Sequence, residues 1–287
     1  MSWHALHIFY YDRHDEFLKN GILQILKEMD IREYFFIRYW ENGPHIRLRI
    51  KDIEDKLQAL INQLNAYIDE NPSKGSIDKK SYEILSEKYY EVEQISEKSP
   101  RIIDNNTIVE WRYIPEEKKY FGKKGVSLAE KEFVYSSNLA LELLSASTKK
   151  EVKIYYGLAY MNLLMKYLTQ KTKVQEFITF YRDYWIKFLD VNDDVLAGYD
   201  NEAERLPWNQ EFYEKIRGAI LKTGFEELHS ELFLKIQELD GSTDWTIVSF
   251  IMNFIHLFNN RIGIVPVEEV RLVKIYLARW GEINGGL

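Results

Sequence analysis

The fold is decided by residues 34–51, which read YFFIRYW-ENGP-HIRLRIK. Two runs rich in aromatic and β-branched residues flank Asn42-Gly43, and this dipeptide between two such runs is the strongest short-range signal for a β-hairpin. Successive side chains of a strand point to opposite faces, so residues 45–51 place three aliphatic side chains on one face and four basic ones on the other. We therefore expect a hairpin with one apolar face and one cationic face.

The cationic face contains His45, Arg47, Arg49 and Lys51. If Asn42-Gly43 is a two-residue turn, Trp40 lies opposite His45, Arg38 opposite Arg47 and Phe36 opposite Arg49. Opposed arginines repel each other unless an anion lies between them, and the guanidinium fork matches a carboxylate. Two interpretations stay open: an anion-binding face, and a solvated face whose arginines pair with carboxylates of a covering helix.

The chain on either side of the hairpin alternates strand and helix. The pattern predicts a strand at 3–11 and helices at 14–29 and 53–69, which gives a β-α-β-β-α start. Residues 71–80 are a polar loop, and a further strand at 108–114 is stopped by Pro115.

Helical periodicity dominates the rest of the chain, after a polar loop that ends at about residue 126. Ser127 and Glu130 have the spacing of a capping box, which predicts a helix start. The expected helices are 127–147, 150–169, 173–190, 209–222, 224–239, 244–262 and 266–280. We predict an α+β fold in one domain, 1–287, with an α/β part at about 1–126, a mixed or antiparallel sheet, and a helical part at about 127–287.

The composition of the chain argues against several classes of function and of site. The 287 residues carry a formal net charge of -7, which disfavours a nucleic-acid-binding surface. There are no cysteines, so disulfides, thiolate metal ligands and cysteine nucleophiles are excluded. No signal-like N-terminus and no apolar run of about 18 residues occur, so we expect a cytoplasmic protein without a membrane partner.

One polar stripe interrupts the apolar helix expected at 244–262. His256 and Asn260 share a face, and Arg261 follows them. A histidine here is suited to exchange protons near neutral pH, or is a core histidine whose ring is satisfied by a backbone carbonyl. The case for a functional role is weaker for His4, His7 and His229, and no metal-binding motif is present in the sequence.

Three segments together resemble the thiopeptide-type bacteriocin biosynthesis family, which includes the C-terminal elimination domain of lantibiotic dehydratases. They read FIRYWENGPHIRLRI at 36–50, YIPEEKKYFG at 113–122 and HLFNNR at 256–261. The family has an arginine before Tyr-Gly-Gly where this chain has Lys119, and Phe121 stands at the first glycine. A lysine keeps the charge but lacks the fork.

The resemblance implies an active site with Arg47, Arg49, Lys119 and His256 as catalytic residues. In the elimination domains the corresponding groups act on Ser or Thr that a separate, tRNA-dependent protein or domain has glutamylated. The substrate-binding candidates that complete this site are Arg38, Trp40, His45, Glu116, Tyr120, Asn260 and Arg261. The expected activity is that of a lyase that removes glutamate and leaves dehydroalanine or dehydrobutyrine in a precursor peptide with a leader, without metal or organic cofactor.

Two other functions stay open. Some stand-alone proteins that the chain resembles are pyridine synthases, which join two dehydroalanines in a formal [4+2] cycloaddition and expel the leader peptide. A non-catalytic partner that binds the precursor peptide is the third possibility, because a shared fold does not establish activity. The sequence does not fix the oligomeric state, and a homodimer is compatible with it.

Overall fold

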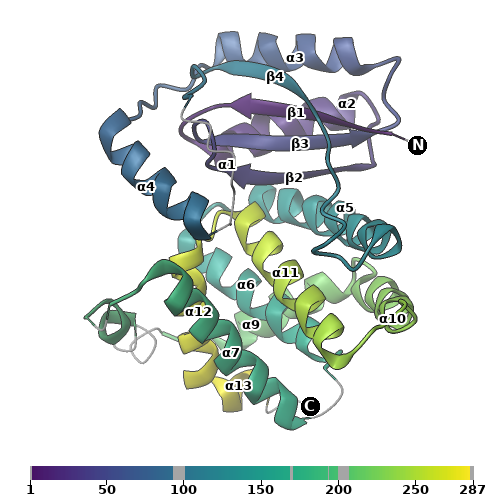
Figure 1. The fold of residues 1–287 in the computed structure, drawn as a ribbon, viewed down its shortest axis with the longest axis vertical. Helices are drawn as coiled ribbons and strands as arrows, with labels where there is room; N and C mark the ends of the chain where they lie inside the picture. Colours follow the sequence, from purple (N-terminus) through teal and green to yellow (C-terminus); the bar gives the residue numbers. More distant parts are fainter. Residues whose placement is uncertain (1, 93–100, 169–170, 193, 200–206, 285–287) are drawn as a thin grey trace. The chain divides into compact units, whose positions relative to one another are not determined.

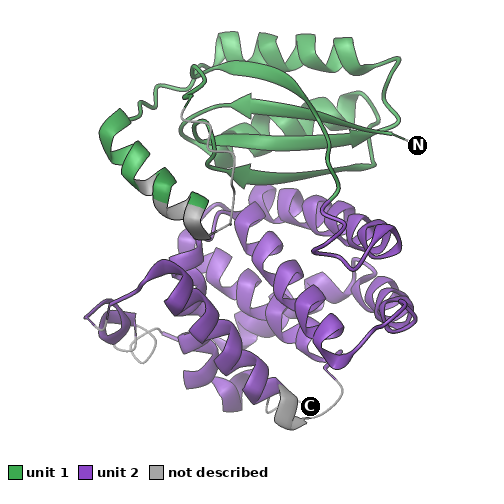
Figure 2. Ribbon diagram, in the orientation of Figure 1, with its two compact units in different colours: residues 1–115 green, residues 116–287 purple. Residues whose placement is uncertain are grey.

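A computed structural model describes residues 2–92, 101–168, 171–192, 194–199 and 207–284. The chain divides into two compact units, which Figure 2 colours separately: unit 1 is Met1–Pro115 and unit 2 is Glu116–Leu287. None of the helices described is long and apolar enough to cross a membrane.

Unit 1 is built on a four-stranded antiparallel sheet with the strand order β2-β3-β1-β4. The strands are β1 (Trp3–Phe9), β2 (Tyr34–Tyr39), β3 (His45–Lys51) and β4 (Thr107–Arg112). The helical segments are α1 (His14–Glu16), the π-helix η1 (Phe17–Ile22), α2 (Leu23–Glu28), α3 (Leu57–Glu70) and α4 (Lys79–Val92). The predicted β-α-β-β-α start and the antiparallel sheet are therefore confirmed, and α2 lies behind the strands in Figure 1.

One face of this sheet is the core of unit 1. Ile46, Leu48 and Ile50 of β3 have no exposed surface, as the alternation predicts. The helices contribute further side chains without exposed surface, namely Phe17, Leu18, Ile22, Leu60 and Leu64. Burying aliphatic side chains of this size contributes about 1.5–3 kcal/mol each, so this face fixes the register of β3.

The predicted pairing across the hairpin is wrong by one residue. Tyr39 lies opposite His45, Ile37 opposite Arg47 and Phe35 opposite Arg49, so no two arginines oppose each other. The reason is a longer turn, residues 40–44, in which the Gly43 N–H donates to the Trp40 carbonyl at 3.1 Å.

This register moves Arg38 to the other face of the sheet. It pairs with Ile46, on the core face, and forms an ion pair with Asp15 of α1 at 2.6 Å. Arg38 is thus separated from the cations of β3 by the sheet itself. The prediction that residues 71–80 form a loop also needs correction, because α4 already begins at Lys79.

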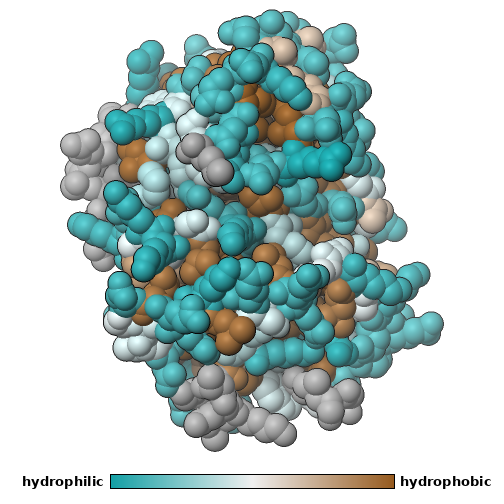
Figure 3. Space-filling model, turned by 90° about the vertical axis from the view of Figure 1, so that its right-hand side faces the viewer, coloured by the Kyte–Doolittle hydropathy of each residue, from teal (hydrophilic) through white to brown (hydrophobic). Residues whose placement is uncertain are grey.

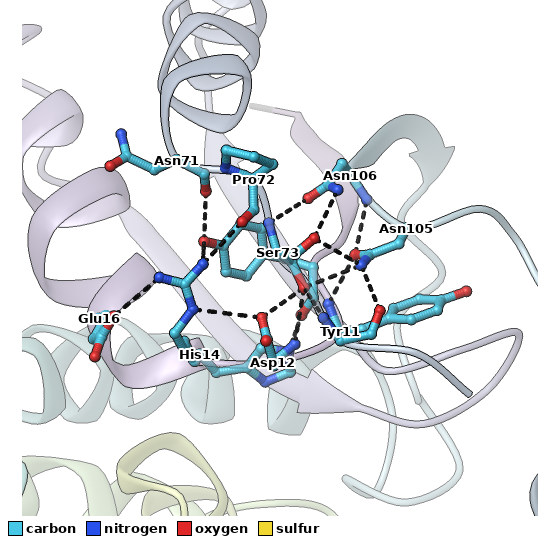
Figure 4. Close-up of polar contacts among 12 residues, drawn as sticks. Tyr11, Asp12, His14, Glu16, Asn71, Pro72, Ser73, Asn105 and Asn106 are labelled. Carbon is cyan, nitrogen blue, oxygen red and sulfur yellow. Dashed lines mark hydrogen bonds and ion pairs between the residues drawn. The ribbon is translucent and has the colours of Figure 1, made fainter. Parts of the chain in front are cut away.

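A clasp of hydrogen bonds holds the connection between α3 and α4 to the sheet (Figure 4). The Ser73 hydroxyl donates to Asp12 Oδ1 at 2.6 Å and accepts from Asn105 Nδ2 at 3.1 Å. Asn106 completes the clasp by accepting from the Ser73 N–H at 2.8 Å. Ser73 is buried, and its hydroxyl is engaged both as donor and as acceptor, so we interpret this cluster as structural.

Unit 2 contains the helices expected in the second half of the chain and also the short helix α13, which was not expected. They are α5 (Lys123–Ala146), α6 (Lys150–Met165), α7 (Lys171–Leu189), α9 (Gln210–Leu221), α10 (Phe225–Gln237), α11 (Asp244–Ile262), α12 (Pro266–Ala278) and α13 (Trp280–Asn284). Every residue from Lys153 to Met165 is buried, so α6 is the central helix, and it contacts α9, α11 and α12.

The capping box predicted at Ser127 is wrong, because α5 begins four residues earlier at Lys123. Its N-cap is Gly122, with φ 97°, and the preceding Phe121 has φ 58°. Two consecutive residues with positive φ turn the chain sharply and set the helix start, so Ser127 and Glu130 lie inside the helix.

His229 of α10 is a core histidine, in line with its weak claim to a function. Its ring has no exposed surface, lies 3.9 Å from the Phe225 ring, and shares a hydrogen bond of 2.8 Å between Nδ1 and the Phe225 carbonyl. Burial lowers the pKa of His229 to about 4, so the imidazole is neutral in the fold.

We expect His229→Phe to weaken the acid sensitivity of unit 2. The unfolded state takes up a proton near pH 6.5 and the folded state only near pH 4, so the stability contributed by the neutral ring is present above pH 6.5 and falls as the pH drops toward 4. Over that window the wild type should lose up to about 3 kcal/mol of unfolding free energy relative to the variant. Urea denaturation at several pH values measures this difference, and a difference independent of pH contradicts the assignment.

Candidate functional site

On the face of the molecule that Figure 3 shows, hydropathy alone does not mark a binding surface. On the face shown in Figure 3, hydrophobic side chains reach the surface between hydrophilic ones. Side-chain chemistry marks two clusters instead, one around His256 in unit 2 and one on the cationic face of β3 in unit 1.

The cluster in unit 2 is a histidine–carboxylate pair. His256 Nδ1 lies 2.7 Å from Glu269 Oε1, and the pair joins α11 to α12. The carboxylate of Glu269 has no exposed surface, whereas the His256 side chain is 26% exposed. Glu269 is therefore held inside unit 2, whereas His256 reaches the surface of this unit.

Two further donors fix the buried carboxylate. Tyr181 of α7 donates its hydroxyl hydrogen to Glu269 Oε2, and Asn259 Nδ2 donates to the same oxygen at 3.1 Å. Burial, together with the adjacent carboxylate, raises the pKa of Tyr181 well above its usual value, so this phenol stays protonated and remains a donor. Glu269 accepts from three side chains in all.

This arrangement selects one form of the histidine ring. A carboxylate can only accept hydrogen bonds, so His256 Nδ1 carries the hydrogen and the lone pair of the neutral ring is on Nε2. The Trp185 ring packs at 4.7 Å from the imidazole and restricts its rotation. An oriented imidazole with a basic Nε2 is the arrangement that general acid–base catalysis uses.

Sequence reasoning found His256 but missed Glu269, Tyr181 and Asn259. The one available signal is that Glu269 falls on the buried face of α12, where Val270, Leu272 and Val273 also lie. A carboxylate among apolar positions needs a buried partner, and His256 lies on the preceding helix.

The cluster in unit 1 centres on Arg47. Its Nε donates to His45 Nε2 at 3.2 Å, its Nη2 donates to Glu41 Oε2 at 3.0 Å, and its guanidinium lies 3.4 Å above the centroid of the Tyr39 ring. The third nitrogen, Nη1, forms no hydrogen bond with the described residues. Arg47 is therefore fixed on three sides and retains one donor group.

His45 acts as a support for this arginine. Its Nδ1 lies 2.8 Å from the Gly43 carbonyl, so Nδ1 donates and Nε2 accepts from Arg47. Burial lowers the pKa of His45 to about 3, with a contribution from the nearby arginines, while the Gly43 hydrogen bond opposes the shift in part. The ring therefore stays neutral. A protonated ring would repel Arg47.

Arg49 lies on the same face and is 9% exposed. Its Nη1 donates to the Arg47 carbonyl at 3.1 Å, and its guanidinium lies 5.7 Å from the Phe35 ring centroid and 5.9 Å from that of Tyr113. The guanidinium groups of Arg47 and Arg49 thus lie against aromatic rings, and Arg47 also forms an ion pair with Glu41. Trp40 lies at the turn, with its ring 4.9 Å from that of Tyr90.

The residues expected around Lys119 differ widely in exposure. Lys119 is 40% exposed and its Nζ lies 3.5 Å from Glu116, which is 63% exposed. Tyr120 is buried, and its ring lies 5.6 Å from those of Phe133 and Phe250. Lys119 and Glu116 are accessible to a substrate, whereas Tyr120 belongs to the core of unit 2.

The two residues expected beside His256 also differ in their exposure. Asn260 is half-buried, and its carbonyl accepts from Gly263 at 3.0 Å. Arg261 has no exposed surface, and its Nη1 donates to Ser136 at 2.8 Å. The buried Arg261 lowers the pKa of Glu132, although burial outweighs this and raises that pKa to about 7. We therefore give Arg261 a role inside unit 2. In the described part of the chain, no group of three or more His, Asp or Glu side chains is placed to hold a metal.

Several known proteins are similar to this chain. It is 24% identical to the epidermin biosynthesis protein EpiB of Staphylococcus epidermidis, over 96% of this chain and 25% of that protein, so it spans about a quarter of this relative. The pyridine synthase TbtD from thiomuracin biosynthesis has a similar fold, with a TM-score of 0.73, 16% identity and coverage of 98% of both chains. The tRNA-dependent lantibiotic dehydratase MibB from Microbispora sp. 107891 matches with a TM-score of 0.59 and 17% identity, over all of this chain and 28% of that one.

A protein-family model also matches most of this chain. The model for the C-terminal part of lantibiotic biosynthesis dehydratases matches residues 3–279, which covers nearly all of both units. The chain belongs to the family of lantibiotic biosynthesis dehydratase C-terminal domains.

Proposed function

We propose that this chain is a lyase that removes glutamate from glutamylated Ser or Thr residues of a ribosomally made precursor peptide. The observation that carries the proposal is the His256–Glu269 pair, with its buried carboxylate, its single tautomer and its partly exposed ring. Family membership supplies the substrate class, because the dehydratases of this family are named for lantibiotic biosynthesis.

The elimination requires one base. His256 Nε2 takes the Cα proton of the glutamylated residue, the electron pair forms the Cα–Cβ double bond, and the Cβ–O bond breaks so that glutamate leaves as its carboxylate. Glu269 stabilises the imidazolium that forms, since it already accepts from Nδ1. The proton is then returned to solvent.

The leaving carboxylate requires a cation. Arg47 meets this need best, because Tyr39, His45 and Glu41 already orient it and one of its nitrogens remains a donor. Arg49 adds a second charge on the same face of the sheet, and Lys119 a third that is more exposed. These roles for Arg47, Arg49 and Lys119 are part of the proposal.

A pyridine synthase is the second candidate. It is favoured by the fold likeness to TbtD, which extends over 98% of both chains and has a higher TM-score than the likeness to MibB. The exposed lysine in place of the family's arginine also favours it, because a lysine does not bind a carboxylate bidentately. The His256–Glu269 pair would transfer protons in either reaction.

Two substrates distinguish the candidates. We expect the wild type to release free glutamate from a glutamylated precursor peptide and to leave a dehydrated, azole-bearing peptide intact, as measured by mass spectrometry. Release of an intact leader from the second peptide instead selects the cycloaddition. If neither peptide changes while both bind, the chain is a non-catalytic partner and the lyase proposal fails.

The role of the buried carboxylate is tested by Glu269→Gln. The amide no longer stabilises the imidazolium and can present a hydrogen to Nδ1, so we expect kcat for glutamate release to fall by roughly 10²–10⁴ with little change in peptide affinity. Glu282→Gln is the control, since it removes a more exposed carboxylate, 44% exposed, from the same unit. Activity within about threefold of wild type in Glu269→Gln would show that His256 does not act through this pair.

The role of the oriented guanidinium is tested by Arg47→Lys, which keeps the charge but removes the fork. We expect a loss of roughly 10²–10³ in kcat/KM, the usual effect of removing one group that stabilises developing negative charge. Arg32→Lys is the matched control, because Arg32 is 84% exposed and, among the described residues, pairs only with the nearby Asp30. Equal activity of both variants would assign Arg47 to the structure of the sheet alone.

A further inference from the structure

Two aromatic side chains of unit 2 form an exposed pair that the proposed reaction does not use. Phe180 of α7 is 39% exposed, and Trp245, near the start of α11, is 53% exposed. Their ring centroids lie 5.2 Å apart. Apolar side chains that are exposed singly are normal on a protein surface, whereas two large rings in contact form a continuous apolar patch. The Phe180–Trp245 pair is therefore a candidate binding surface.

The geometry of the pair favours one kind of ligand. The planes of the two rings meet at 79°, so the rings together form a corner. A third ring that enters this corner can lie against the face of one ring and the edge of the other, and aromatic rings favour both arrangements. An aromatic side chain therefore suits the corner better than a charged or an aliphatic one.

An apolar stripe connects the pair to His256 along α11. Val248 and Met252 follow Trp245 at spacings of three and four residues, and His256 follows Met252 at a spacing of four, so these side chains share one face of the helix. Val248, Met252 and His256 are all half-buried, so the stripe reaches the surface of unit 2. The flexible side chain of methionine adapts to different partners. A peptide that extends from His256 toward the pair would thus lie on apolar surface.

The distance from His256 to the pair can be estimated along both helices. Trp245 precedes His256 by eleven residues of α11, which corresponds to about 16 Å. Along α7, Phe180 precedes Trp185 by five residues, and the Trp185 ring lies 4.7 Å from the imidazole, which gives about 12 Å in all. An extended peptide advances about 3.3 Å per residue, so these paths correspond to about four or five peptide residues.

We propose that the Phe180–Trp245 pair binds an aromatic side chain of the precursor peptide, about four or five residues from the modified Ser or Thr. The precursor peptide as the occupant rests on the proposed function, whereas the affinity of the pair for an aromatic side chain does not. A second copy of this chain is a poor occupant, because the two rings together expose roughly 200 Å² and a stable interface buries about 800 Å² on each partner. One aromatic side chain matches the area that the pair offers.

Fluorine NMR and fluorescence anisotropy with a set of capped peptides test this surface. Each peptide carries a glutamylated Ser whose ester is replaced by an amide, so that it cannot eliminate, and one Phe that is two, five or nine residues away in either chain direction. A peptide with Ala in place of Phe is the reference. We expect a peptide with the five-residue spacing to bind about tenfold or more tightly than the Ala peptide. In protein labelled with fluorotryptophan it should shift the resonance of Trp245, which is identified by its loss in Trp245→Phe.

Two variants test the rings separately by anisotropy. Trp245→Ala and Phe180→Ala should each reduce the preference for Phe over Ala in the five-residue peptide to within about twofold, because a single ring forms no corner. Leu234→Ala is the control, since it removes an apolar side chain that is 63% exposed from α10 of the same unit, and it should keep the full preference. If one ring variant fails to fold, the other keeps the test valid.

Other outcomes overturn the proposal. Equal affinity for the Phe and Ala peptides, equal affinity at all three spacings, or a preference that neither ring variant reduces would each do so, as would no binding to any peptide. Analytical ultracentrifugation that finds a dimer in the wild type and a monomer in Trp245→Ala identifies a second copy as the occupant and removes the peptide.

The fate of this surface and that of the lyase can be told apart, because binding is measured without turnover. A chain that binds the five-residue peptide through Trp245 but releases no glutamate from a glutamylated precursor refutes the lyase and leaves the aromatic surface standing. Release of glutamate at equal kcat/KM from ester peptides with Phe and with Ala does the reverse.

Discussion

The buried carboxylate of Glu269 is the constraint on which the helical unit depends. Its three donors, His256, Tyr181 and Asn259, come from α11 and α7, so one side chain of α12 ties three helices together. Removing one partner of such a buried, charged network typically costs about 3–5 kcal/mol, because the remaining charge loses its compensation. The orientation of His256 therefore follows from the packing of unit 2, and a peptide substrate does not have to create it.

A second buried carboxylate in the same unit shows why burial alone does not make a site. Glu132 accepts from Tyr160 and lies in the field of Arg261, and all three side chains lack exposed surface. Burial raises the pKa of Glu132 to about 7, yet none of its partners reaches the surface. The HLFNNR segment thus has two kinds of polar residue: its histidine is held by Glu269 and reaches the surface of unit 2, and its arginine is buried and donates to Ser136.

Sequence patterns predicted the elements of this fold better than their pairing. The β-α-β-β-α start, the antiparallel hairpin and the α11 bounds 244–262 follow from local periodicity, and family membership follows from three short segments. The predicted register was wrong because a five-residue turn and a two-residue turn both fit Asn42-Gly43. The five-residue turn shifts the pairing by one residue and places Arg38 on the other face of the sheet. Glu269 was missed for a related reason: its place among apolar positions predicts a buried partner, but nothing in a spacing of 13 residues shows that two helices bring a histidine and a carboxylate within 2.7 Å.

The choice between elimination and cycloaddition then depends on the cations and not on the proton-transfer pair. Both reactions need a base, and the His256–Glu269 geometry suits either. Only elimination also has to bind a departing glutamate; the proposed function gives this role to Arg47, whose Nη2 is engaged by Glu41. The neutral ring of His45 matters here, because a charged imidazole would repel the guanidinium that it supports. If Arg47 has the role that we propose, loss of its fork would leave the His256–Glu269 pair intact and remove bidentate binding of glutamate, and this difference would separate the two chemistries.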